Sequence, residues 1–492
     1  MMTQPLKRLH PLVLIFDLYK LVKSNIIFFI FLFLLNMGSE KWWIQTAKWI
    51  FLGYVVIMLF LSIGKWITYR YVINNDAFYI KSGIFSKSER TIPFLKVQNV
   101  QRQTTVFHKI FKVTSLTLET ATVGDESSIT FDVISRVEAE SIESAVTETR
   151  ERKEIIEQSS DELFEEQVVV VEPEKKDKKV IHFTPTKKDL VKASFTSLSF
   201  LILIPIIFKL DDVIKLDVFR DEVTNALKWG WAILAAILMG VLLISIAIGM
   251  VHTFIKYGKY EISSDTQKVY IKKGVLDESI FSIRKEKIQA VEISQSFMKR
   301  LLGLAEVKLI SAGNTTIGEV ESNILYPFLP VRKAYTLISE LLPDYKVVES
   351  MHELPKKAFW IRMIRPSYIW LIATALIWYF KPSLWWVSVV LLLIIYSSRI
   401  LDYKNSRYLL NQSFIQMKTG GFSTVLFITK RSQVIEVKTE RSKLQRYFKL
   451  ASIKTVNRAK PVLHKELLDV PHEAASEFYS WYVDRTKEVK MQ

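Results

Sequence analysis

The sequence predicts an α+β membrane protein in which six transmembrane helices, arranged as three hairpins, alternate with three cytosolic β-rich domains. The chain of 492 residues is 49% hydrophobic yet contains 67 basic and 50 acidic side chains. Such a composition requires that apolar and charged residues be segregated along the chain. The apolar stretches do occur in pairs, and a similar polar segment follows each pair. This alternation indicates three repeats, each with a membrane-embedded part and a polar part.

Six stretches of the sequence contain no charged residue. A bilayer core about 30 Å thick requires about 20 helical residues. One stretch exceeds that length, and the others are 15 to 17 residues long with lysine or arginine near their ends, whose long side chains reach the interface. The stretches are Ser24–Ser39, Trp49–Gly64, Ala193–Phe208, Trp229–Ile255, Pro366–Phe380 and Pro382–Ser398. Only Lys381 separates the last two, so a re-entrant hairpin is the alternative to two full crossings there.

Lysine and arginine are distributed unevenly between the two sides that these stretches define. Close to the stretches, eighteen lie on one side, and seven lie in the short connectors on the other side. Basic residues favour the cytoplasmic side of a membrane. We therefore expect a multi-pass protein of the cytoplasmic (inner) membrane with its N- and C-termini in the cytoplasm.

The polar segments resemble one another. The first aligns with the second at a shift of 191 residues without a gap, which places Gly83 on Gly274. A third copy aligns with small gaps, with Gly420 at the turn and Ser432–Val437 matched to Ile288–Ile293. Alternating β-rich runs separated by turn residues predict strands. A helical pattern ends each segment, as in Leu329–Leu342 and Pro471–Val489, so each segment should be a small barrel or sandwich closed by a C-terminal helix.

The repeated segment resembles the bacterial pleckstrin-homology-like (PH-like), membrane-flanked domain family. The turn glycine, a strand and a Leu-Leu-Gly-Leu-Ala segment occur in the order typical of that family. The residues that match are Arg90-Thr91-Ile92-Pro93, Val97-Gln98-Asn99-Val100, Ile288-Gln289-Ala290-Val291, Lys299-Arg300-Leu301-Leu302-Gly303-Leu304-Ala305-Glu306-Val307, Gln433 and Leu450-Ala451. The resemblance covers most of the chain and implies a multi-pass member with three PH-like domains. It also implies a membrane setting and a non-enzymatic role, and it supplies no ligand.

These features give the following organisation: transmembrane hairpins over residues 1–64, 181–255 and 351–398, PH-like domains over 65–137, 256–350 and 399–492, and a charged acidic linker over 138–180. Thirteen acidic and three basic residues lie in Glu138–Glu174. We expect Ala139–Phe164 to continue the helix that closes the first domain and Glu165–Lys179 to be a tether. Docking of a basic partner to this acidic segment is the alternative.

Motifs of catalytic or metal chemistry are not found in the sequence. The chain has no cysteine, which excludes disulfides, Fe–S clusters, thiolate zinc sites and cysteine nucleophiles. The seven histidines do not form a His-Glu-x-x-His pattern, and the chain contains no P-loop, Gly-x-Gly-x-x-Gly or Gly-x-Ser-x-Gly motif. We therefore expect no enzymatic activity, no cofactor and no metal.

Positive charge is concentrated in the third polar segment. Residues 399–487 have a net charge of +9. Each basic residue held near an anionic leaflet contributes about 1 kcal/mol to membrane attraction. The residues expected to face lipid headgroups or an acidic partner are Lys430, Arg431, Lys438, Arg441, Lys443, Arg446 and Lys449. A solvated basic face is the alternative.

Small residues recur every four positions in the fourth apolar stretch, at Ala232, Ala236 and Gly240. Such a stripe lets helices approach closely, so we expect it to assemble the bundle or a dimer. The preferred hypothesis is a cytosolic scaffold for envelope homeostasis or stress defence that binds anionic headgroups or a partner protein. The expected partners are the phospholipid bilayer, a smaller membrane protein of the same family and other copies of the chain, without nucleic acid. A small-molecule exporter is the rival hypothesis, although no ionisable residue lies at the centre of any stretch.

Overall fold

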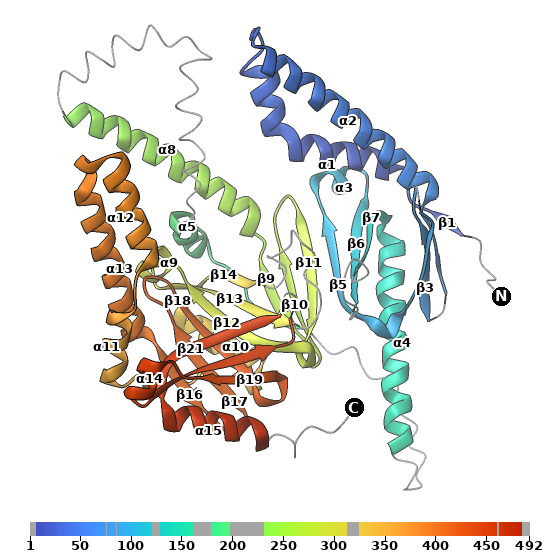
Figure 1. Cartoon of the computed structure of the whole chain (residues 1–492). Helices are drawn as coiled ribbons and strands as arrows, with labels where there is room; N and C mark the ends of the chain where they lie inside the picture. Colours follow the sequence, from blue (N-terminus) through green and yellow to red (C-terminus); the bar gives the residue numbers. More distant parts are fainter. Residues whose placement is uncertain are drawn as a thin grey trace. The chain divides into compact units, whose positions relative to one another are not determined.

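The computed structural model describes residues 6–74, 76–84, 86–120, 128–161, 179–196, 231–311, 324–459 and 462–484 (Figure 1). The chain divides into two compact units. The first contains residues 1–178, 184–261 and 270–282, and the second contains residues 179–183, 262–269 and 283–492. The second repeat is therefore split between the two units.

The first unit begins with two apolar helices that lie side by side (Figure 1). Helix α1 (Leu12–Phe29) continues into a π-helical turn, and α2 (Trp42–Thr68) returns to the first repeat. Two groups of antiparallel strands follow. The first group is β1 (Lys7–Arg8), β2 (Arg70–Ile73), β3 (Ala77–Ser82) and β4 (Ser88–Pro93), and the second is β5 (Val97–Thr104), β6 (Val113–Thr120) and β7 (Ser128–Ser135).

Two helices complete the first repeat. The short helix α3 (Val106–Ile110) connects β5 to β6, and α4 (Arg136–Asp161) follows β7. The buried side chains of α4, Ala139, Ile142 and Val146, join the core with strand residues and with Val13 and Phe16 of α1. Helix α4 therefore closes the repeat, as the sequence predicts.

The second repeat has the same order of elements. Its helices are α5 (Lys187–Thr196), α8 (Trp231–Tyr257), α9 (Phe297–Leu301) and α10 (Val331–Leu341). Its strands are β8 (Val180–Phe183), β9 (Glu261–Ser264), β10 (Lys268–Lys273), β11 (Glu278–Arg284), β12 (Ile288–Gln295), β13 (Leu304–Ser311) and β14 (Ile324–Pro330).

The third repeat lies entirely in the second unit. Its helices are α11 (Lys356–Ile364), α12 (Tyr368–Phe380), α13 (Trp385–Asn405), α14 (Lys443–Tyr447) and α15 (His472–Val483). Its strands are β15 (His352–Glu353), β16 (Arg407–Leu410), β17 (Phe414–Thr419), β18 (Thr424–Lys430), β19 (Val434–Glu440), β20 (Leu450–Asn457) and β21 (Leu463–Pro471). Helix α15 buries Ala475, Phe478 and Trp481 in the core of this repeat.

Consecutive repeats share sheets. In the first unit, β5 of the first repeat pairs with β11 of the second, with Val100 opposite Ser282. In the second unit, β12 pairs with β18 of the third repeat, with Val291 opposite Ile428. The resulting seven-stranded sheet has the order β14-β13-β12-β18-β17-β16-β15. The three β-rich segments are therefore not separate barrels, because the two seven-stranded sheets among the described residues each combine strands of consecutive repeats.

From the glycine turn to the turn that follows the short helix, equivalent residues of consecutive repeats are separated by a constant number of positions. The third repeat follows the second at an offset of 146 residues, since Gly274, Ile288 and Gly303 correspond to Gly420, Val434 and Lys449 in backbone conformation or pairing. The predicted match of Ser432–Val437 to Ile288–Ile293 is therefore wrong by two residues. A shift of two preserves the alternation of a strand, so the sequence pattern alone does not detect it.

The structure adds detail at the predicted linker and hairpins. Helix α4 begins at Arg136 and packs into the first core as far as Val146, so the first part of the predicted linker 138–180 is helical, in line with the helix predicted over Ala139–Phe164. A short strand also precedes the apolar helices of each repeat: β1, β8 and β15 pair with β2, β9 and β16. Residues 7–8, 180–183 and 352–353 therefore belong to the sheets, because their backbone groups complete an edge.

Three helical segments in the described part of the chain are long and apolar enough to cross a membrane: Trp42–Thr68, Lys356–Phe380 and Pro382–Asn405. The last two include the fifth and sixth charge-free stretches. Most of the third stretch, Ala193–Phe208, lies outside the described residues, as do residues 162–178 of the predicted linker.

Candidate functional site

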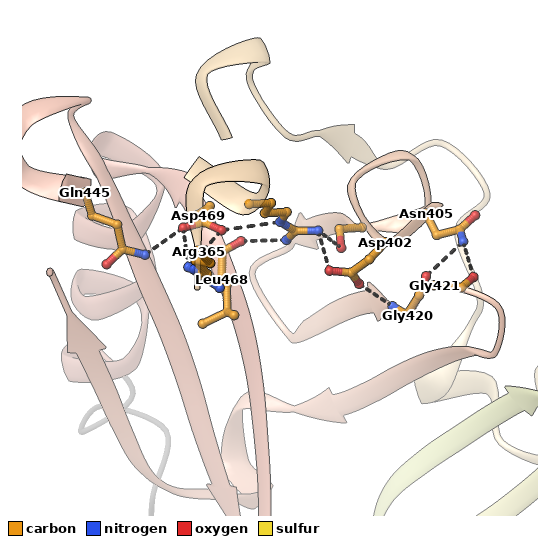
Figure 2. Close-up of polar contacts among 10 residues, drawn as sticks. Arg365, Asp402, Asn405, Gly420, Gly421, Gln445, Leu468 and Asp469 are labelled. Carbon is orange, nitrogen blue, oxygen red and sulfur yellow. Dashed lines mark hydrogen bonds and ion pairs between the residues drawn. The ribbon is translucent and has the colours of Figure 1, made fainter. Parts of the chain in front are cut away.

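A buried ionic cluster joins the apolar helices of the third repeat to its sheet (Figure 2). Asp469 on β21 is fully buried. One of its carboxylate oxygens accepts a hydrogen bond from Arg365 Nη2 at 2.8 Å, and the other lies 3.3 Å from Arg362 Nε. Gln445 Nε2 of α14 donates to the same carboxylate at 2.8 Å. A carboxylate at this depth is stable only when it is paired and hydrogen-bonded, and both conditions are met here.

Arg362 connects three elements of this repeat. It lies on α11, and its side chain is 5% exposed. Its Nη1 donates to Asp402 Oδ2 at 2.8 Å and to Ser406 Oγ at 2.9 Å, while Nη2 donates to the Leu468 carbonyl at 3.1 Å. A guanidinium group presents five donors in a rigid plane. Arg362 therefore fixes α11, the end of α13 and β21 relative to one another.

The glycine turn between β17 and β18 is held against α13 (Figure 2). The Gly420 N–H donates to Asp402 Oδ1 at 2.9 Å, and Asn405 Nδ2 donates to the carbonyls of Gly420 and Gly421 at 2.8 and 3.0 Å. A Cβ atom at residue 421 would overlap Ser398 of α13. The close approach of turn and helix therefore requires glycine at this position.

The first repeat has an equivalent junction. Asp132 of β7 accepts hydrogen bonds from Lys20 of α1 at 2.6 Å and from Lys65 of α2 at 3.2 Å. Burial alone raises the pKa of the Asp132 carboxyl, but Lys65 and Lys20 outweigh burial and hold this pKa below its ordinary value. The Asp132 carbonyl also pairs with His108 Nε2 of α3 at 2.9 Å. Strand, short helix and both apolar helices meet at one point here too.

A cavity of about 1240 Å³ lies beside this junction, between α1, α2 and the turn that connects β3 to β4. Apolar side chains line most of it, among them Leu21, Met58 and Leu61. Three lysines, Lys20, Lys23 and Lys65, also line it. These ammonium groups are already paired, Lys20 and Lys65 with Asp132 and Lys23 with Asp277, so the cavity offers chiefly an apolar surface.

Four of the seven predicted headgroup-facing residues make local contacts. Lys430 pairs with Asp344 and lies 5.0 Å from the Tyr345 ring centre, so it joins the second repeat to the third. Arg431 begins the turn before β19, and its backbone N–H donates to the Ser413 carbonyl at 2.8 Å. Lys438 pairs with Glu440 on the same strand, and Arg441 bonds to the Leu450 carbonyl at 3.3 Å.

The other three, Lys443, Arg446 and Lys449, are exposed on and just after α14. Leu444 and Tyr447 of α14 are exposed beside them. The structure therefore places only part of the predicted basic cluster on one surface, where it accompanies apolar side chains. This arrangement is typical of elements that contact the membrane interface.

The predicted small-residue stripe lies on α8. The side chains of Ala232 and Ala236 lie outside the described residues. A Cβ atom at Gly240 would meet open space, so this glycine makes no close helix contact within the described part of the chain.

Sequence reasoning missed the partners of the junction. Lys20 and Arg365 were interpreted only as ends of apolar stretches, and Asp132, Arg362 and Asp469 were not identified as partners. The bonded pairs are more than 100 residues apart in sequence, as for Lys20 with Asp132 and Arg362 with Asp469. Among the described residues, no group of three or more histidines and carboxylates is placed to hold a metal ion.

Three repeats of one sheet-and-helix unit, with apolar helices before the first and third and the apolar helix α8 before the second in the described residues, define a repetitive membrane-associated protein. The family model described as "Bacterial PH domain" matches residues 24–150, 203–344 and 363–486. The chain therefore belongs to the bacterial PH domain family, with three successive copies, which confirms the predicted resemblance. The chain is also 28% identical over 502 aligned positions to the UPF0699 transmembrane protein YdbT of Bacillus subtilis (strain 168), covering 98% of this chain and 99% of that protein. No solved structure matches the chain.

Proposed function

We propose that this protein is a non-catalytic, multi-pass protein of the cytoplasmic membrane that holds three PH-like repeats against the inner leaflet as a scaffold. Six spans would form three hairpins, with both termini in the cytoplasm. Its homologue is named a transmembrane protein, and three described helical segments here are apolar and long enough to cross a membrane.

The observation that carries the proposal is the junction of Arg362 and Arg365 with Asp469. Because these residues link α11 and α13 to the sheet through buried bonds, the third repeat cannot rotate freely about its spans. A flexible tether would require none of these contacts. The junction therefore supports a repeat with one fixed face toward the membrane, as a scaffold requires.

The ligand that this arrangement favours is the anionic headgroup of membrane phospholipids. Lys443, Arg446 and Lys449 are exposed on and just after α14. Gln445 of α14 and Arg365, which lies between α11 and α12, both donate to Asp469, so the exposed basic residues lie near the connection between α11 and α12. Three basic residues at an anionic surface contribute about 1 kcal/mol each.

The proposed apposition can be tested with the full-length protein in nanodiscs of phosphatidylcholine, with or without phosphatidylglycerol. A fluorophore on a cysteine introduced at Glu477, which is exposed on α15, reports energy transfer to a headgroup dye. We expect stronger transfer with anionic lipid and a loss of this difference at about 1 M salt, where charges are screened beyond about 3 Å. The combined variant Lys443→Gln, Arg446→Gln and Lys449→Gln should lose the difference as well.

A matched control removes the same charge elsewhere on the second unit. Arg332, Lys333 and Lys346 are exposed, and their replacement by glutamine should leave the lipid dependence intact. An equal loss in both variants would reject a specific headgroup-facing surface. Spans and orientation are tested separately: cysteines at Glu40 and Ser383 should react with an impermeant thiol reagent only from outside the cell, and a cysteine at Glu353 only from inside.

A further inference from the structure

The short helix of each repeat exposes a large apolar or aromatic side chain at the same position. Ile110 of α3, Leu301 of α9 and Tyr447 of α14 are equivalent by the offsets of 191 and 146 residues, and they are 69%, 68% and 83% exposed. A single exposed apolar side chain needs no explanation, but recurrence at one position in three repeats does.

Helix α9 presents the largest of these surfaces. Phe297, Met298, Leu301 and Leu302 are each between 40% and 68% exposed within six consecutive residues. On a protein in water, a contiguous exposed apolar surface of this kind marks a site of interaction with a membrane or a protein. Arg300 is exposed between the apolar pairs, whereas Lys299 is paired with Glu306.

Contacts place α9 at the end of an apolar helix. Arg300 Nη2 donates to Asn405 Oδ1 at the end of α13 at 2.9 Å, and Nη1 donates to the Gly421 carbonyl at 3.2 Å. The Phe297 and Phe422 rings lie edge to face with centres 6.0 Å apart. The turn that contains Gly421 packs against Ser398, where the charge-free stretch of α13 ends. Helix α9 therefore lies at the level where α13 becomes polar.

Helix α3 has the same relation to the apolar helices of the first unit. Phe107 packs on Phe16 of α1, with ring centres 5.2 Å apart. Lys109 donates to the Val275 carbonyl at 2.9 Å, and the Val275 N–H donates to the Ile255 carbonyl of α8 at 2.9 Å. Ile255 is the last residue of the fourth charge-free stretch. Two short helices in two units thus share one kind of placement.

We propose that α3 and α9 are interfacial helices, which insert Ile110 and Leu301 with their apolar neighbours into the headgroup region of the inner leaflet. An amphipathic element buries its apolar face about 5–10 Å into the boundary between headgroups and acyl chains. Lys109 and Lys299 are each paired with a glutamate, and the exposed Arg300 of α9 matches the anionic leaflet in charge. A protein partner is disfavoured because the adjacent helix ends already place this surface at the bilayer.

The inference rests on the proposed membrane crossing of α13. The experiment therefore tests the interfacial position of α3 and α9 and the crossing of α13 separately. The chain has no cysteine, and single cysteines can therefore be introduced without other changes. Full-length variants Leu301→Cys, Ile110→Cys, Leu393→Cys and Tyr479→Cys would carry an environment-sensitive fluorophore in proteoliposomes. Leu393 is exposed on α13, and Tyr479 is exposed on α15, which lies away from α9 in the second unit (Figure 1). Quenching by spin-labelled phospholipid is compared with quenching by iodide.

We expect phospholipid-borne spin labels to quench Leu301→Cys and Ile110→Cys nearly as strongly as Leu393→Cys, and iodide to quench Tyr479→Cys alone. Adding Met298→Glu to the Leu301→Cys protein should reduce lipid quenching, because a charge enters the same surface. Iodide quenching at 301 and 110 with lipid quenching retained at 393 would overturn the inference alone. Protection from both quenchers would reveal a protein contact and also overturn it, whereas absent lipid quenching at 393 would reject the proposed crossing itself.

Discussion

Asp132 and Asp469 lie in equivalent two-residue bulges of β7 and β21, Asp132 as the first bulge residue and Asp469 as the second, and each accepts hydrogen bonds from basic residues of the helices that enter its repeat. The bulge turns a carboxylate toward the helix ends without interrupting the sheet. Lysines supply the partners in the first repeat and arginines in the third. The junction therefore recurs in position although its residues differ.

Removal of the buried carboxylate should destabilise the third repeat strongly. In Asp469→Asn the buried Arg362 guanidinium loses one of its two charge partners and keeps Asp402, so the loss should lie at or below the about 3–5 kcal/mol typical of breaking a buried ion pair. Hydrogen exchange of the β20 and β21 amides in detergent measures the free energy of local opening. The control Glu440→Gln breaks an exposed ion pair of the same repeat and should leave exchange unchanged. Equal protection in Asp469→Asn and the natural protein would show that the junction does not hold the strands.

The first junction should stabilise its repeat in a pH-dependent manner. The pKa of Asp132 is lowered in the folded state, so its ionised form stabilises the fold above the unfolded value of about 3.9. That contribution is lost as the pH falls through the lowered folded-state pKa. The exchange rates of the β6 and β7 amides should therefore differ between Asp132→Asn and the natural protein at pH 7. The two sets of rates should become equal in strong acid. A difference that is the same at both extremes would indicate packing rather than charge.

Sequence patterns predicted the features that depend on neighbouring residues. A charge-free stretch indicates a helix that lies in lipid rather than in water, and the glycines at 83, 274 and 420 indicate turns. Both properties depend only on residues that are close in the sequence. The structure gives all three glycines a positive φ. The closing helices α10 and α15 were predicted for the same reason, from periodic apolar residues.

The pairing of distant residues was not predictable from one sequence. To predict that β12 pairs with β18, one must know which strand edges of the two repeats are adjacent. The sequence of neither strand carries that information. Likewise, Arg362 resembles any basic residue at the end of an apolar stretch until Asp469 is placed beside it. The predicted basic cluster was contiguous by charge, but Lys430 and Lys438 have acidic neighbours in space.

His108 should make the first repeat sensitive to mild acid. Burial lowers its pKa, and the neutral ring accepts the Thr105 N–H at Nδ1 while Nε2 bonds to the Asp132 carbonyl. Below the unfolded value of about 6.5, the unfolded chain binds a proton that the folded ring resists, so stability falls. The third repeat has Gln445 at the equivalent position, where it forms the same capping box.

The substitution His108→Gln gives the first repeat the residue that the third repeat has at the equivalent position. It should retain the capping box of α3 and remove the loss of stability between about pH 7 and 5. Thermal unfolding or amide exchange of α3 and β6 across that range measures the effect. If the His108→Gln protein keeps the acid response, another group causes it.

Two glycines of the second repeat should respond differently to alanine. Gly274 has a φ of +93°, and a Cβ there would overlap the Asp277 carbonyl oxygen, so the turn must move. Gly303 has a φ of +66° with open space around it, and Lys112 and Lys449 occupy the same position in the other repeats. A left-handed conformation costs an L-residue about 1–2 kcal/mol. Gly303→Ala should therefore cost about 1 kcal/mol and Gly274→Ala clearly more, as measured by exchange of the β10 and β11 amides for residue 274 and of the β13 amides for residue 303. A loss at Gly303 as large as that at Gly274 would show that backbone conformation, and not the approach to Asp277, determines both costs.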